Sequence, residues 1–218
     1  MKKFLILAIS CLMAILMIAC GNAPSEDNEK ELASVGEKSY TYKEATAFLD
    51  SGDKENAILA LRNCDDKEAA AKRKELYISL YGEEFYNKVH SAKKGDVITF
   101  GSFEQDDNDG NGKEPIEWIV LDVEKDGRLV LLTKYCIERV SYNKKAEDIT
   151  WEECFIRSWL NKGFLDDSFT KEEQWIIPTS FVENDDNPLY GTNGGNDTYD
   201  KAFLLSIKEA QDYFENDR

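Results

Sequence analysis

The chain has 218 residues, with 43 Asp and Glu against 27 Lys and Arg, and a formal net charge of −16. A surface this acidic repels phosphate groups, which argues against nucleic acid as a partner. The hydrophobic content of 42% is enough for a core, and the length suits one or two domains.

Residues 1–19 have the pattern of a secretory signal peptide. Lys2 and Lys3 precede the apolar run 4–18, which is too short to span a bilayer comfortably. The residues around Cys20 resemble the lipobox of bacterial lipoproteins, although Met17 stands where that family prefers Leu. The resemblance implies cleavage before Cys20, acylation of its thiol and of the new N-terminus, and an extracytoplasmic protein anchored to the cell membrane. Two acyl chains together give stable anchoring.

Residues 20–39 are polar and charged without periodicity, which predicts a lipidated flexible tether. Residues 40–91 carry a helical pattern, in which Gly52 and Asp53 separate a first helix from a second and Asp66 begins a third. The pattern resembles one tetratricopeptide repeat in the spacing of Ala45, Phe48, Gly52, Ala57 and Leu61. A generic helical hairpin is the alternative interpretation.

Residues 95–218 predict a mixed α+β domain, so the fold class of the chain is α+β. Apolar runs at 97–100, 116–123 and 128–133 predict strands, and Asp126-Gly127 between the last two predicts a hairpin. Capping boxes at Thr150 and Thr170 predict helices, the first ending at residues 161–163. Further strands are expected at 179–182 and 202–205, and Ser206 is expected to cap a last helix.

A series of short motifs in this domain strongly resembles the domain-of-unknown-function family 6273. The motifs are Gly95-Asp96, Phe100-Gly101, the run 111–118, Tyr142-Asn143, Thr150-Trp151, the run 157–161, the run 193–198, and Phe203 to Ser206. The resemblance implies no established activity, and the pattern is loosely similar to C-type-lectin-like folds. Family members usually continue into further C-terminal segments that this chain lacks, which implies an incomplete domain with an exposed strand edge.

The best metal candidate is the loop that begins at Asp107. Asp107, Asp109 and Asn111 match the first oxygen ligands of a calcium-binding loop. Trp118 stands at the position of the final Glu, which excludes a complete EF-hand. A plain acidic hairpin loop is the alternative to a small calcium site.

A second candidate is the long polar loop near the C-terminus. It carries oxygen-bearing side chains that form a candidate ligand loop, namely Asn184, Asp185, Asn196, Asp197 and Asp200. In lectin-like folds such a loop often holds calcium and ligand, whereas a solvated surface loop is the alternative.

Catalytic signatures are weak in this sequence. His90 is the single histidine, and a nucleophile elbow is absent. Cys136 and Cys154 are candidates for a disulfide, or they join Cys64 as small apolar thiols. We therefore expect a non-catalytic binding module for a protein or glycan. The alternatives are an enzyme on a lectin-like or formylglycine-generating-type fold, and a non-functional truncated product.

Overall fold

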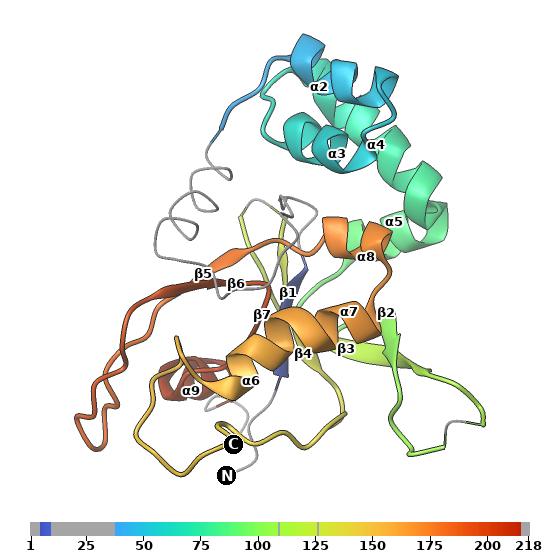
Figure 1. The fold of residues 1–218 in the computed structure, drawn as a ribbon. Helices are drawn as coiled ribbons and strands as arrows, with labels where there is room; N and C mark the ends of the chain where they lie inside the picture. The colour runs from blue at the N-terminus through green and yellow to red at the C-terminus, as the bar shows by residue number, and fades with distance from the viewer. Residues whose placement is uncertain (1–4, 10–37, 109, 126, 215–218) are drawn as a thin grey trace.

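The computed structural model describes residues 5–9, 38–108, 110–125 and 127–214, and it has the predicted α+β architecture (Figure 1). A group of helices comes first, and a sheet-containing region follows it. The helices are α2 (Tyr42–Asp50), α3 (Lys54–Arg62), α4 (Lys67–Tyr81) and α5 (Glu83–Ser91).

Side-chain caps begin the helices where the sequence predicts them. The backbone N–H of Asn56 donates to Asp53 Oδ1 at 3.1 Å, and that of Glu68 donates to Asp66 Oδ1 at 2.8 Å. Ala45 and Ala57 are fully buried, because small side chains let α2 and α3 approach closely. The predicted helical region is therefore confirmed, and the tetratricopeptide resemblance stays a prediction.

The main sheet has five strands in the order β2-β3-β4-β1-β7, and every neighbouring pair is antiparallel. Its strands are β1 (Leu5–Ile9), β2 (Val97–Phe103), β3 (Glu114–Val123), β4 (Leu129–Thr133) and β7 (Ala202–Leu204). The predicted β3–β4 hairpin is confirmed: the N–H of Glu124 donates to the carbonyl of Arg128 at 2.8 Å, and Gly127 takes a φ of 87° in the turn.

Strand β1 lies within residues 1–19, the segment that the sequence predicts to be a signal peptide. In the full-length chain it lies between β4 and β7, with Leu7 opposite Leu131 on one side and Ala202 on the other. An apolar segment without proline satisfies its backbone groups well in such a position. None of the helices that the structure describes is long and apolar enough to cross a membrane.

Three consecutive helical segments pack on the sheet: α6 (Phe155–Ser158), the π-helix η1 (Trp159–Phe164) and α7 (Leu165–Ser168). The prediction that Thr150 caps this helix is wrong, because residues 151–153 form a turn and Cys154 is the N-cap. The predicted end at 161–163 is also wrong, because the backbone continues through the π-helical turn. In contrast, the capping box at Thr170 is confirmed at the start of α8 (Lys171–Trp175).

The remaining elements are a small antiparallel pair, β5 (Ser180–Val182) with β6 (Thr198–Asp200), and the last helix α9 (Ile207–Phe214). The predicted strands at 179–182 and 202–205 are thereby confirmed. The predicted Ser206 cap is confirmed as well, since the N–H of Glu209 donates to Ser206 Oγ at 3.1 Å.

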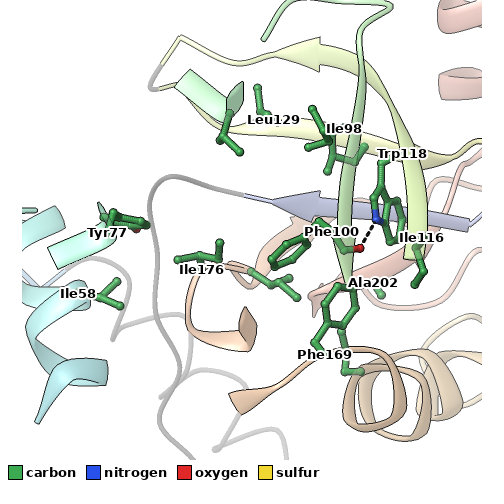
Figure 2. Packing of buried hydrophobic residues seen from close by; sticks show 14 of the residues in the cluster. Ile58, Tyr77, Ile98, Phe100, Ile116, Trp118, Leu129, Phe169, Ile176 and Ala202 are labelled. Carbon is green, nitrogen blue, oxygen red and sulfur yellow. Dashed lines mark hydrogen bonds between the residues drawn. The ribbon is translucent and has the colours of Figure 1, made fainter. Parts of the chain in front are cut away.

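The core centres on Trp118, which is fully buried between the sheet and its helices (Figure 2). Its indole N–H donates to the carbonyl of Phe100 at 2.7 Å, and the Phe100 and Phe169 rings lie 5.0 Å apart. Gly101 has a φ of 71°, and a Cβ there would lie 2.3 Å from the Phe169 ring. The strand therefore needs glycine at this point to approach Phe169 so closely.

Candidate functional site

A surface groove of about 610 Å³ is the candidate binding site of the C-terminal domain. It lies between the end of β2, the segment 138–144 and the helical run α6–η1–α7. Its lining is part aromatic and part charged, and comprises Phe103, Glu138, Arg139, Val140, Ser141, Lys144, Phe155, Trp159 and Asp167.

The aromatic wall of the groove is fixed by packing beneath it. The half-buried Trp159 ring lies 5.5 Å from the buried ring of Phe164 and meets Phe103 edge-on at 6.5 Å. Phe103 and Phe164 are themselves 5.6 Å apart. One side of Trp159 is thus held by the core, while the ring also lines the groove.

The polar rim of the groove carries both signs of charge. Arg139 and Lys144 are exposed cations, and Glu138 and Asp167 are exposed carboxylates. Lys144 Nζ lies 4.1 Å from the centre of the Phe155 ring, a cation–π contact that holds the lysine at the rim. Aromatic surface with interspersed donors and acceptors suits a polar ligand that also has apolar faces.

Segment 138–144 is joined to α6 behind the groove. The N–H of Ile156 donates to the carbonyl of Tyr142 at 3.1 Å, and Cys154 donates from its thiol to the carbonyl of Trp151 at 3.1 Å. Burial, together with the nearby Cys154, raises the pKa of Tyr142, which keeps its phenol neutral. The polar rim is therefore carried by a segment with a defined position.

Asp200 forms a buried polar network next to this helical run. Its Oδ1 accepts from Arg157 Nε at 2.8 Å, and its Oδ2 accepts from the Trp151 indole at 2.9 Å and from Thr198 Oγ1 at 2.7 Å. Only 2% of the Asp200 residue is exposed. This carboxylate holds α6 against β6, so its position is structural.

Asn161 in η1 fixes the backbone of β7. Its Nδ2 donates to the carbonyl of Ala202 at 2.8 Å, and its Oδ1 accepts from the N–H groups of Lys201 and Ala202 at 2.8 and 3.2 Å. Lys201 Nζ then donates to the carbonyl of Gln174 at 3.1 Å. Burial lowers the pKa of Lys201 to about 8, against an attraction to Glu55 that raises it.

The structure brings together only part of the predicted ligand loop. The backbone N–H of Asn184 donates to Asp197 Oδ1 at 2.8 Å, and Asn184 Nδ2 donates to the carbonyl of Asn196 at 2.7 Å. Asp185 is exposed on the same loop. Asp200 does not join them, because it is buried in the network with Arg157.

The predicted calcium residues lie beside a different set of carboxylates. Glu104, Asp106 and Glu114 have carboxylate oxygens within 4.8 Å of one another. Asn111 Nδ2 donates to Asp106 Oδ2 and to Glu114 Oε1, both at 3.1 Å. Of the other two predicted residues, Asp107 is exposed with a φ of 59°, and Asp109 lies outside the described residues.

The cysteines form no disulfide among the residues that the structure describes. Cys64 and Cys154 are buried, which favours the interpretation of these two as small apolar thiols. Cys136 is exposed instead, with its sulfur 3.7 Å from the carbonyl of Glu138. Cys20 and its predicted acylation lie outside the described residues.

Sequence reasoning missed the groove because its residues come from three separate segments. Trp159 follows a helical pattern, which predicts a core position as for the buried Trp118 and Trp151. Sequence reasoning also missed the carboxylate cluster, because Glu104, which directly follows β2, and Glu114, which begins β3, lie outside the loop motif. The signal available in the sequence was the number of acidic residues on both sides of the motif.

Residues 126–218 match the model of a family described as a domain of unknown function (DUF6273). The match supports the resemblance inferred for the C-terminal domain, and it includes α6, η1, β6 and β7. No curated protein and no solved structure matches the chain.

Proposed function

We propose that this protein is an extracytoplasmic lipoprotein, anchored to the cell membrane by acylated Cys20, whose C-terminal domain is a non-catalytic binding module. The order of charged residues, apolar run and Cys20 supports the anchor. The excess of carboxylates adds repulsion from anionic lipid, so the acyl chains must supply the membrane affinity.

The groove at Trp159 is the observation that carries the binding function. A half-buried indole held by Phe164, with Arg139 and Glu138 beside it, offers a stacking face and hydrogen-bonding groups to one ligand. Sugar rings have this combination of apolar faces and hydroxyl edges, so the ligand class we propose is a glycan. A protein partner is the alternative, favoured by the exposed Leu189 and Tyr190 at the tip of the 184–197 loop, which are 71% and 81% exposed.

Metabolic labelling tests the anchor. Cells that express the chain and receive labelled palmitate should incorporate the label into the wild-type protein and not into Cys20→Ala, because only a thiol takes the diacylglycerol. The matched control is Cys136→Ala, which removes an exposed thiol without touching the lipobox. Equal palmitate label in Cys20→Ala and the wild type, or no label in the wild type, would refute the anchor.

Binding to a panel of soluble oligosaccharides tests the groove. We expect Trp159→Ala and Arg139→Ala to lose binding, and Trp175→Ala, another half-buried indole, to keep it. Arg139 is exposed, so its removal leaves the core packing unchanged. Binding that survives both groove variants, or binding only to proteins through the Leu189 tip, would contradict the glycan proposal.

A calcium ion is a second candidate ligand, and the convergence of Glu104, Asp106 and Glu114 favours it. Calcium prefers six to eight oxygen ligands, and turning the Asn111 amide would add its oxygen to the three carboxylates. Millimolar calcium should then raise the melting temperature, and Glu114→Gln should abolish the rise. Asp107→Asn distinguishes the two loop interpretations: it should keep the rise if the carboxylate cluster binds the ion, and lose it if Asp107 is a ligand.

A further inference from the structure

The five-stranded sheet contains a position that the leader occupies. Strand β1 pairs antiparallel with β4 through Ile6 to Ile9 and with β7 through Leu5 to Leu7. Because β1 is antiparallel to both, β4 and β7 run parallel to each other. Two interstrand spacings, roughly 10 Å, separate β4 from β7. If β1 were removed, these two strands would therefore be too far apart to form hydrogen bonds with each other.

Strand β7 is held at that distance by contacts on its other edge. Asn161 bonds both the N–H and the carbonyl of Ala202, at 3.2 and 2.8 Å. The neighbouring Asp200 is bonded to Arg157 and to the buried Trp151 indole. Closing the sheet by moving β7 onto β4 would break these contacts.

The vacant position would present unpaired backbone groups in the core. In an antiparallel ladder the N–H and carbonyl of one residue point to the same side, and the side alternates along the strand. Ala202 directs its pair toward Asn161, so Phe203 directs its pair toward β1, where Ile6 lies opposite. Leaving buried backbone groups without partners costs about 1–3 kcal/mol for each group.

The walls of this position are apolar on both faces of the sheet. Leu131 and Ala202 are fully buried, and Leu129 and Phe203 are 1% and 8% exposed. An occupant must therefore be extended, apolar on successive residues and free of proline at its centre. Residues 20–37 do not meet this requirement, because their two uncharged runs are not apolar on successive residues: 20–25 contains Asn22, Pro24 and Ser25, and 32–36 contains Ser34 and Gly36.

We propose that the mature protein accepts an apolar strand of a partner polypeptide between β4 and β7, antiparallel to both. The inference rests on the proposed function, since cleavage before Cys20 removes β1 and vacates the position. Recognition is by backbone pairing with β4 and β7 along their facing edges, and the apolar walls select the side chains.

Fluorescence anisotropy with a labelled peptide of residues 2–10 tests the proposal. Lys2 and Lys3 keep this peptide soluble, and it should bind the processed protein. The Leu7→Pro peptide should bind at least about tenfold more weakly, because proline cannot donate to the ladder at the central position. The unprocessed Cys20→Ala chain should not bind the peptide, because its own β1 fills the position.

Hydrogen exchange locates the peptide. Its addition should slow exchange of the backbone amides of β4 and β7 in the processed protein and leave α4 unchanged. Equal binding of the two peptides, or of the two protein forms, would overturn the proposal. Full protection of β4 and β7 before peptide is added would also overturn it, because another segment of the same chain would then fill the position.

Mass spectrometry of the intact protein extracted from membranes distinguishes failure of this inference from failure of the proposed function. A membrane-extracted protein that retains residues 1–19 would refute the lipoprotein proposal. The peptide assay on a leader-deleted chain with Cys20→Ser still tests the strand position in that case, because it needs neither processing nor acylation.

Discussion

Removing the carboxylate of Asp200 should destabilise the C-terminal domain strongly. The side chain accepts from Arg157, Trp151 and Thr198, and the Arg157 side chain is only 16% exposed. Asp200→Ala leaves a partly buried cation and two buried donors without this acceptor. Breaking a buried ion pair by removing one partner costs about 3–5 kcal/mol, so we expect a loss of about 4 kcal/mol in the free energy of unfolding.

Two further variants separate charge from shape. Asp200→Asn keeps the volume and one acceptor oxygen, and it should cost about 2 kcal/mol because the charge-assisted bond to Arg157 is lost. In the double variant with Arg157→Met the loss should be smaller than the sum of the single losses, because the cation and its partner leave together.

Urea unfolding of the full chain, with Cys20→Ala in every protein to block acylation, measures these losses. The matched control is Asp148→Asn, an exposed aspartate, for which we expect a change within about 0.5 kcal/mol. If Asp200→Ala lost less than about 1 kcal/mol, the assignment of Asp200 as a structural residue would be refuted, and a role in the ligand loop would again be the better explanation.

Two other predictions concern single positions in the same domain. Gly101→Ala should lower the free energy of unfolding by roughly 2–4 kcal/mol in the same urea assay, because the new Cβ meets the Phe169 ring. The control is Gly112→Ala, with a φ of 78° and open space around it, which should lower the free energy of unfolding by only about 1 kcal/mol. Equal losses for the two variants would refute the close-packing argument. Lys201→Met should raise the free energy of unfolding of the protein by about 2 kcal/mol at pH 7. The pKa of Lys201 in the folded state is about 8, below the usual 10.5, so the fold disfavours the charged ammonium. Loss of the hydrogen bond to the carbonyl of Gln174 offsets part of this gain. The wild type gains stability as pH rises from about 8 to 10.5, so the advantage of Lys201→Met should shrink over that window, and an advantage independent of pH would contradict the burial argument.

Local sequence signals account for much of the fold. The Thr170 capping box, the Ser206 cap and the turn at Gly127 each depend on residues within a few positions of one another, and all three appear as predicted. The Thr150 box fails although its sequence is equally good. Trp151 is drawn into the core by its bond to Asp200, and this tertiary contact prevents the predicted helix start.

The candidate sites depend on contacts between distant segments, which no local pattern contains. The polar residues of the late loop predict a single ligand site, yet Asp200 pairs with Arg157 and only Asn184, Asn196 and Asp197 stay together. The π-helical turn moves Trp159 to the groove and leaves Asn161 facing β7, whereas a regular 3.6-residue period predicts another arrangement of these faces.

The position of β1 between β4 and β7 has a consequence for the order of events during synthesis. The leader emerges first, but its partner β4 begins about 120 residues later, and at about 5–20 residues per second that segment takes roughly 6–24 s to make. Until then residues 5–9 have no strand of their own chain to pair with, so under the proposed function the export machinery can bind the leader first. If the protein is exported as we propose, a chain completed before export begins would already hold this strand in its sheet, and the rate of translation would influence how much protein is exported.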